Sequence, residues 1–278
     1  MYPAAFDYHR ADSVADAIKI LQENPEAKLI AGGHSLLPMM KLRLAQPAAL
    51  VDISRISDLS GVREDGDSIV IGAMTTYYDL IKSDVVQQKL PMLAEAANSV
   101  GDAQVRNKGT IGGALAHCDP ASDFPAVALA LDAEITTVGS NGERSCNASQ
   151  FFLDMFTPRL DPDEVVTQIR IPNVGSIAGA TYKKFAHPAS GYAIVGIAAV
   201  RTSNGDVRAA VTGSVPIAVR LSAVESEISG KDLTEDNIKA AAEKATEGMD
   251  FVGDIHASEE YRAHLTKVYT RRALEAIA

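Results

Sequence analysis

Two glycine-bearing segments are the strongest candidates for chemistry in this sequence. The first is Ala31-Gly32-Gly33-His34-Ser35-Leu36, and the second is Gly109-Thr110-Ile111-Gly112-Gly113. Glycine adopts positive φ without steric cost, and successive backbone N–H groups can then point into one concavity that suits an anion. The missing Cβ atoms let the backbone approach that anion closely, while Ser35 and Thr110 offer hydroxyl donors. Either segment alone is also typical of a tight turn, but the pair together predicts a diphosphate site.

The overall charge and the glycine spacing exclude the commoner ways of binding such an anion. The 278 residues include 26 Lys and Arg against 36 Asp and Glu, a net charge of -10. A nucleic-acid partner is not expected, because binding a phosphate backbone needs a basic face. No two glycines are two residues apart and no G-x-x-x-x-G-K-[ST] occurs, which disfavours a nicotinamide Rossmann domain and a P-loop NTPase. Local donors must therefore hold the diphosphate.

Metal binding and membrane insertion are not indicated. The two cysteines, Cys118 and Cys146, cannot build a disulfide scaffold, a Cys-rich zinc site or an iron–sulfur cluster. His117, Cys118 and Asp119 are adjacent, and neighbours in an extended chain point to opposite sides, so no metal site is predicted. The longest stretch without Asp, Glu, Lys or Arg, residues 185–200, is too short and too polar for a transmembrane segment. The N-terminus lacks the features of an export signal, so we expect a cytoplasmic protein.

The elements that must position the two segments are strands and helices in irregular order. Apolar periodicity, caps and turn residues predict a helix capped by Ser13, a hairpin around Asp65-Gly66 and a helix capped by Thr75. Further strands are expected at residues 6–9, 28–30, 50–53, 135–138, 165–171, 192–201 and 207–215, and further helices at residues 91–100, 124–131, 234–245 and 261–277, with a linker at 173–176. This order favours an α+β fold over a doubly wound parallel sheet.

At the two glycine segments the sequence resembles the medium, FAD-binding subunits of carbon monoxide dehydrogenases. The wider group includes the flavin domains of xanthine dehydrogenases and aldehyde oxidases. The resemblance is carried by residues 31–41, Thr110-Ile111-Gly112-Gly113 and Asp119-Pro120-Ala121-Ser122-Asp123, with support from residues 6–10, 71–76 and 271–274. It extends over essentially the whole chain, and the two glycine segments together make it specific.

The resemblance implies an α+β, p-cresol methylhydroxylase-type FAD-binding fold. It consists of two α+β subdomains, residues 1–56 and 57–175, followed by a small C-terminal α+β domain, residues 176–278. The FAD pyrophosphate is expected between the glycine segments. The cofactor-binding residues implied by matching positions are Leu29, Ile30, Ala31, Gly32, Gly33, His34, Ser35, Leu36, Val100, Thr110, Ile111, Gly112, Gly113, Ala114, Asp123, Val166, Lys184 and Tyr192.

Some of these positions have a second, purely structural interpretation. Asp123 matches a carboxylate that contacts a ribose hydroxyl, but it could equally cap the helix that begins at Phe124. Val166 matches an apolar residue that contacts the adenine, although its default interpretation is a buried strand residue. Lys184, rather than Lys183, matches a lysine near the flavin. Tyr192 matches an aromatic ring at the isoalloxazine, and ordinary packing would also explain it.

The sequence departs from its relatives at two places. Related subunits often carry asparagine where this chain has Ala114, so that contact must come from the backbone or disappear. Residues 183–192 lack the extra basic residues of carbon monoxide enzymes, which leaves a sister enzyme with another substrate open.

The resemblance also implies what the chain does and what it assembles with. It would bind FAD non-covalently, take electrons from [2Fe–2S] clusters on a small partner subunit and pass them to an external acceptor. The molybdenum cofactor would lie on a large partner subunit, in a dimer of heterotrimers attached at most peripherally to the inner face of the membrane. No residue of this chain is expected to be catalytic toward the substrate. The alternatives are an aldehyde, xanthine or N-heterocycle dehydrogenase subunit, a free-standing FAD-dependent oxidase, or a non-enzymatic nucleotide-binding protein.

Overall fold

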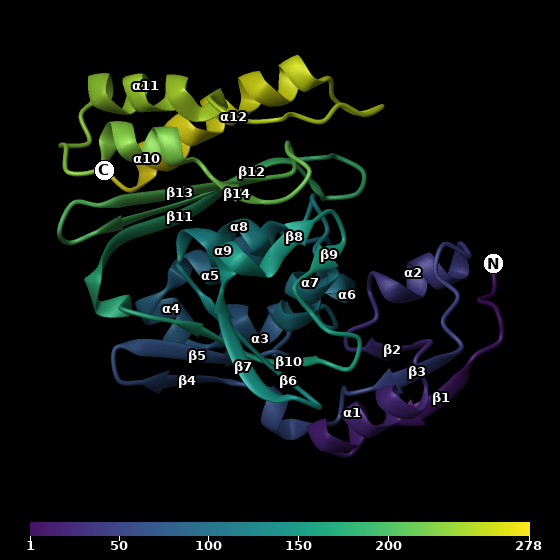
Figure 1. Cartoon of the computed structure of the whole chain (residues 1–278). Coiled ribbons are helices and arrows are strands. Elements are labelled where there is room, and N and C mark those ends of the chain that lie inside the picture. Colours follow the sequence, from purple (N-terminus) through teal and green to yellow (C-terminus); the bar gives the residue numbers. More distant parts are fainter.

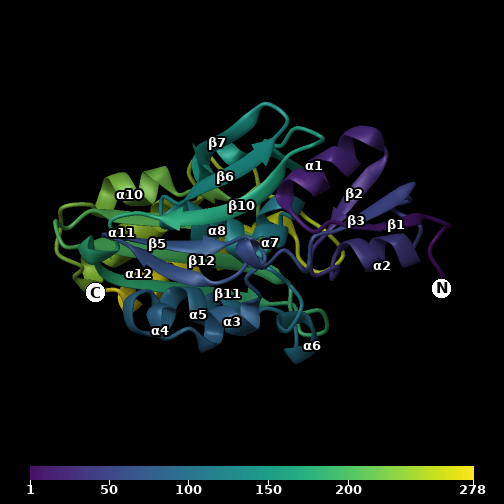
Figure 2. The same ribbon diagram turned by 90° about the horizontal axis from the view of Figure 1, so that it is seen from below.

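The N-terminal part of the chain is a small parallel sheet between two helices (Figure 1). We describe it, and the rest of the fold, from a computed structural model of residues 1–278. The strand order is β1-β3-β2, and α1 and α2 cover opposite faces of the sheet (Figure 2). The Ser13 hydroxyl caps α1 by accepting from the Asp16 N–H. The elements are β1 (Asp7–Arg10), α1 (Val14–Glu23), β2 (Ala27–Ile30), α2 (Leu36–Lys41), β3 (Ala49–Asp52) and η1 (Ser57–Leu59).

The middle of the chain is a five-stranded antiparallel sheet, in the order β4-β5-β10-β6-β7, with helices packed on it. Its main core holds the largest buried side chains, including Phe124 and Phe151. The elements are β4 (Val62–Asp65), β5 (Ser68–Gly72), α3 (Tyr77–Lys82), α4 (Asp84–Lys89), α5 (Pro91–Ser99), α6 (Ala103–Arg106), α7 (Ile111–His117), α8 (Asp123–Ala130), β6 (Glu134–Gly139), β7 (Gly142–Asn147), α9 (Ala148–Phe151), β8 (Phe152–Asp154), β9 (Thr157–Pro158), β10 (Val165–Ile171) and η2 (Val174–Ser176).

The C-terminal part is a four-stranded antiparallel sheet covered on both faces. The middle part lies against one face, and α10, α11 and α12 lie on the other (Figure 1). Arg208 and Arg220 of this sheet both donate to Asp132, just after α8, and so tie the sheet to the middle part. The elements are β11 (Ile177–Ala186), β12 (Ala193–Thr202), β13 (Val207–Thr212), β14 (Val219–Arg220), α10 (Ser222–Ile228), α11 (Glu235–Glu243), η3 (Lys244–Thr246) and α12 (Glu259–Ala276).

The α+β fold class is confirmed, and three local expectations need correction. The helix expected after Thr75 is capped by Thr76, because the Thr75 hydroxyl donates instead to the Gly61 carbonyl in the interior. The second glycine segment is not a loop, since Thr110 caps α7 and Gly112 and Gly113 lie in its first turn. Strand β11 was missed, because its alanines, glycine and lysines blur the apolar alternation that marks a strand.

The buried carboxylate of Glu164, just before β10, binds Arg144 of β7. Arg144 donates from Nε and Nη2 to Glu164 at 2.5 Å each, and the Asp161 N–H and the Thr137 hydroxyl donate to it as well. Burial alone would raise the pKa of Glu164, but these hydrogen bonds outweigh it and the pKa is lowered. A depressed folded-state pKa gives stability that is present above the unfolded pKa and is lost as the pH falls through the folded value.

We therefore expect Glu164→Gln to destabilise the chain by about 2 kcal/mol at neutral pH. The difference from wild type should shrink as the pH falls below the ordinary glutamate pKa and through the lowered folded-state pKa, where the wild-type carboxylate also becomes protonated. Urea unfolding at several pH values measures it, and a pH-independent difference would contradict this assignment.

Candidate cofactor-binding site

The first glycine segment presents a row of free backbone donors. It follows β2, and Gly33 adopts a φ of 73°, which only glycine takes without strain. None of the N–H groups from Ala31 to Leu36 has an acceptor within the chain, although all but His34 are partly buried. Partly buried amides normally have a partner. This segment therefore has the donors that an anion requires.

The second glycine segment has only one such free amide, that of Thr110, whereas the sequence-based expectation was a row of them. The Ile111 N–H donates to the Thr75 carbonyl, the Gly112 N–H to the Ala73 carbonyl, and the Gly113 N–H to the Thr110 hydroxyl oxygen. The proton of the Thr110 hydroxyl is left without an acceptor in the chain. The first segment thus supplies a row of main-chain donors, whereas the second supplies the Thr110 N–H, the Thr110 hydroxyl and the positive end of a short helix.

The two segments lie in direct contact. A Cβ at Gly32 would lie 1.9 Å from the Lys108 carbonyl oxygen, and a Cβ at Gly113 would lie 3.8 Å from that of Ala31. A Cβ at Gly112 would lie 2.5 Å from that of Ala73. Gly32 and Gly112 are therefore also required for packing within the chain, because a side chain at either position would clash with neighbouring residues.

A buried ion pair lies beside the segments. The Lys184 ammonium donates to Asp123 at 2.9 Å and to the Ser99 carbonyl at 3.0 Å, and the Tyr182 hydroxyl donates to the other Asp123 oxygen. Both charged side chains are 5% exposed. Burial raises the pKa of Asp123, and Lys184 and Tyr182 oppose that rise. Lys183 points the other way, to Glu95.

The helix-cap interpretation of Asp123 is wrong. Asp123 is the first residue of α8, and Ser122 occupies the cap position without a side-chain hydrogen bond. Both Asp123 oxygens already accept from the chain, which makes its carboxylate a node between α8 and β11. A carboxylate offers about four acceptor positions, so it can still accept from a ligand hydroxyl.

Tyr192 lies between the first glycine segment and this ion pair. Its side chain is 46% exposed and precedes β12. Partial burial and the nearby Asp119 raise the pKa of the Tyr192 phenol, while the nearby Ser35 side chain opposes that rise. The preceding Gly191 packs against Gly101, since a Cβ there would be 3.5 Å from the Gly101 Cα. The aromatic ring is thus held next to the free amides.

The remaining predicted residues divide into near and distant ones. Val100 ends α5 directly after the Ser99 carbonyl that Lys184 contacts. The Val166 side chain is 6% exposed and packs in the main core, which also contains Ile111. The Ala114 N–H donates to the Thr110 carbonyl within α7, so the backbone cannot replace the missing asparagine there.

Two tyrosines near the site were missed from the sequence. Tyr182 is two residues before Lys184 on β11, so strand alternation would have placed both on the same face. Tyr77 stacks on Phe124 with ring centroids 5.1 Å apart, and burial together with the charge of Asp123 raises its pKa. No pattern in the sequence marks Tyr77.

Of the adjacent His117, Cys118 and Asp119, the first and third contact each other, with 3.8 Å between His117 Nε2 and Asp119 Oδ2, while the Cys118 thiol points elsewhere. His117 lies against Phe156, the Cys118 thiol donates to the Asp154 carbonyl, and Asp119 accepts from the Ala121 N–H. Burial raises the pKa of Cys118 to about 11, so its thiol stays protonated at neutral pH.

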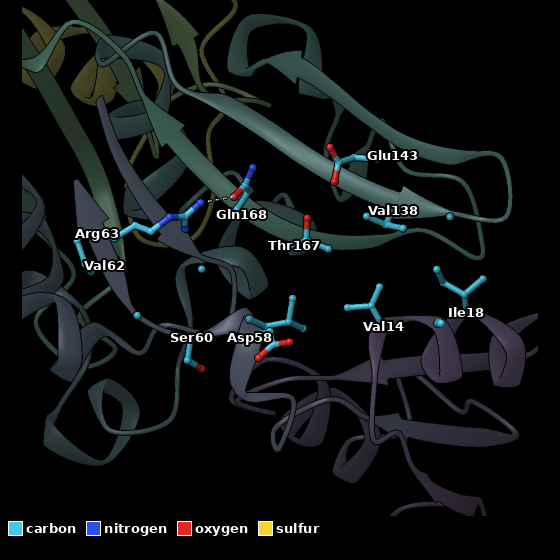
Figure 3. Close-up of a pocket in the computed structure, with 15 residues that line it drawn as sticks. Val14, Ile18, Asp58, Ser60, Val62, Arg63, Val138, Glu143, Thr167 and Gln168 are labelled. Carbon is cyan, nitrogen blue, oxygen red and sulfur yellow. Dashed lines mark hydrogen bonds between the residues drawn. The ribbon is translucent and has the colours of Figure 1, made fainter. Parts of the chain in front are cut away.

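A large cavity of the molecule lies elsewhere. It has a volume of about 780 Å³ and lies between α1, residues 58–63 and strands β6 and β10 (Figure 3). Val14 and Ile18 line one side, while Arg63 donates to Gln168 at 3.4 Å on the other. None of the predicted cofactor residues lines this cavity, and it has no cluster of free amides. The free amides and the buried ion pair, not the cavity, mark the candidate site.

Comparison with known families shows the family to which the chain belongs. Residues 4–174 match the family described as the FAD binding domain in molybdopterin dehydrogenase, and residues 180–277 match the CO dehydrogenase flavoprotein C-terminal domain. The chain belongs to the family of FAD-binding subunits of molybdopterin dehydrogenases.

Similar proteins cover nearly the full length of this flavoprotein. It is 42% identical to the carbon monoxide dehydrogenase medium chain of Hydrogenophaga pseudoflava, over 99% of this chain and 98% of that protein. It is 38% identical to the glyceraldehyde dehydrogenase medium chain of Sulfolobus acidocaldarius, over the whole of both chains. The solved Hydrogenophaga carbon monoxide dehydrogenase that lacks the Mo-pyranopterin moiety matches it with a TM-score of 0.95 and 43% identity, over 100% of this chain and 98% of that one.

The resemblance noted in the sequence is thereby confirmed, as are the FAD cofactor and the oxidoreductase class. The residues of the flavoprotein also suit FAD. They offer free amides for a diphosphate, a buried carboxylate for hydroxyl groups and a half-exposed aromatic ring. No helix of the flavoprotein combines the length and the apolar character needed to cross a membrane.

Proposed function

We propose that this flavoprotein is the electron-transferring medium subunit of a molybdenum hydroxylase of the carbon monoxide dehydrogenase type. A large partner subunit oxidises the substrate at molybdenum, and [2Fe–2S] clusters on a small partner subunit deliver the electrons to this chain. The chain passes them to an external acceptor. The observation that supports this best is the row of free amides from Ala31 to Leu36 beside Tyr192. Such a site serves a dinucleotide and has no acid–base pair directed at a substrate.

The chain's own groups have distinct parts in this function. The amides from Ala31 to Leu36 and the Thr110 hydroxyl bind the diphosphate. Asp123 accepts from cofactor hydroxyls, and Lys184 holds its carboxylate in place. Tyr192 covers the ring system and excludes water from one of its faces. FAD, when bound there, supplies the exchange of one or two electrons.

Carbon monoxide is the substrate we favour for the complex, and an aldehyde is the second candidate. The medium chains of a carbon monoxide dehydrogenase and a glyceraldehyde dehydrogenase are similarly close to this chain. The absence of extra basic residues in residues 183–192 keeps the second candidate open.

Three further features belong to the same proposal. We divide the chain at residues 1–56, 57–175 and 176–278, supported by the four sheets, each of which lies within one of these ranges. We place it in a dimer of heterotrimers, in the cytoplasm or peripherally at the inner face of the membrane.

Analysis of the native complex tests the proposed function. We expect about one FAD per chain, together with molybdenum and iron from the partners, and bleaching of the flavin absorbance when carbon monoxide is added. Bleaching by an aldehyde alone would support the second candidate. FAD without any molybdenum or iron in the purified material would contradict the function, and reduction of the isolated chain by a substrate would indicate a free-standing oxidase.

A further inference from the structure

Tyr77 has an almost fully buried ring whose hydroxyl group has no partner in the chain. The side chain is 7% exposed, and its ring stacks on Phe124 with the ring planes 13° apart. Fully enclosed side-chain atoms that lack a hydrogen-bond partner occur only in Arg208, Arg262 and Thr270. The Tyr77 oxygen makes no hydrogen bond either, yet it is not one of these enclosed atoms, so it opens onto accessible space. Buried polar groups normally have a partner, and this one is left for something outside the chain.

The space that this hydroxyl faces adjoins the candidate FAD site. Tyr77 begins α3, and its N–H donates to the Gly109 carbonyl at 3.0 Å. A Cβ at Gly109 would lie 2.7 Å from Tyr77 Cε2, so the ring lies directly against the second glycine segment. Burial raises the pKa of Tyr77 most, and the nearby Asp123 carboxylate and Tyr192 phenol raise it further. The hydroxyl therefore lies among the groups that we assign to the cofactor.

No neighbouring group accepts the proton of this hydroxyl. The Asp123 oxygens accept from Tyr182 and from Lys184, and neither is hydrogen-bonded to Tyr77. The raised pKa keeps the Tyr77 hydroxyl protonated at neutral pH, so it remains a donor. A dinucleotide that fills the site excludes water from the hydroxyl, and a buried donor without an acceptor costs free energy. An acceptor atom of the cofactor is the partner that the site leaves for it.

We propose that Tyr77 is a further cofactor-binding residue, whose hydroxyl donates a hydrogen bond to the bound FAD. This inference rests on the proposed function, in which Asp123 and Tyr192 contact the same cofactor. FAD has acceptor atoms along its whole length, in its phosphates, its hydroxyl groups and its ring system. Packing alone would need only the ring of Tyr77, and phenylalanine would supply that ring equally well. Removal of the hydroxyl therefore separates a role in binding from a role in packing.

Tyr77→Phe removes the hydroxyl and keeps the ring, with its stacking on Phe124 and its contact with Gly109. Since the hydroxyl has no partner in the chain, the FAD-free variant should unfold at the same temperature as wild type. FAD binding should weaken about five- to tenfold, because one hydrogen bond to the cofactor is lost. Tyr78→Phe is the matched control, because Tyr78 follows on the same helix, is 47% exposed and lies beside Lys82. This control should bind FAD as wild type does.

The test uses the full chain, expressed in its own host and isolated with the subunits that co-purify. After the FAD content is measured and FAD is removed, titration with FAD gives the dissociation constant from flavin fluorescence, and thermal unfolding of the FAD-free protein checks the fold. Equal FAD affinity of Tyr77→Phe and wild type would overturn the inference and leave the proposed function intact. Weaker binding together with a lower unfolding temperature of the FAD-free variant would assign the hydroxyl a structural role and overturn the inference as well. If the wild-type protein carries no FAD, the proposed function fails and the role of Tyr77 fails with it.

Discussion

Gly32→Ala should weaken FAD binding by about 10- to 100-fold, equivalent to ~1–3 kcal/mol. The added Cβ would lie 1.9 Å from the Lys108 carbonyl oxygen, a backbone atom that cannot rotate away. The two glycine segments would have to separate, and the amides of the first would lose their position relative to Thr110. Equilibrium titration of the apoprotein with FAD, followed by flavin fluorescence, measures the change.

Gly66→Asn is the matched control for this substitution. Gly66 has a φ of 62°, which asparagine tolerates, and a Cβ there meets nothing within 4 Å. This variant should bind FAD as wild type does. If Gly32→Ala bound FAD equally well, the contact between the two segments would not matter for the cofactor.

Lys184→Met should lower the free energy of unfolding by about 3–5 kcal/mol. Methionine keeps the length of the side chain but leaves the buried Asp123 carboxylate without its cation and the Ser99 carbonyl without its donor. Urea unfolding of the full chain measures the loss. Lys183→Met is the control on the same strand, and it should cost less than 1 kcal/mol, because the Lys183–Glu95 pair is more than a third exposed.

The pH dependence of the Lys184 variant identifies the cause. The pKa of Asp123 is raised by burial even in the intact pair, and removing Lys184 removes a group that opposes the rise. A raised folded-state pKa means that folding favours the protonated carboxyl, so stability is lost as the pH rises through that pKa. Lys184→Met should therefore be less stable at pH 8 than at pH 5. Adding Asp123→Asn should remove this dependence; a dependence that persists would point to another group.

The sequence predicted best those elements that local residues determine. Ser13 with Asp16 predicted the cap of α1, and Asp65-Gly66 predicted the turn of the β4–β5 hairpin. These signals act within a few residues of one another, so no distant contact is needed to interpret them. The family resemblance was also readable, because the residues that carry it lie in short continuous stretches such as 31–41 and 119–123.

The errors arose where distant contacts decide. Thr75 and Thr76 both suit a helix cap, but Asp79, three residues after Thr76, forms a capping box with it, and the Thr75 hydroxyl donates to the Gly61 carbonyl instead. A glycine pair predicts a turn, yet Gly112 lies in a helix. It is glycine because its neighbour Ala73 leaves no room for a side chain. The buried network around Asp123 joins α8 and β11, about 60 residues apart, and no local pattern could predict its geometry.

The unequal hydrogen bonding of the two glycine segments has a consequence for how the protein matures. Since the first amides of α7 donate to Ala73, Thr75 and Thr110, most of the hydrogen bonds in this half of the binding site are made within the chain. The stretch after β2 has the larger number of donors without an acceptor. We therefore expect the chain to fold before FAD binds, and FAD binding to order mainly the segment from Ala31 to Leu36.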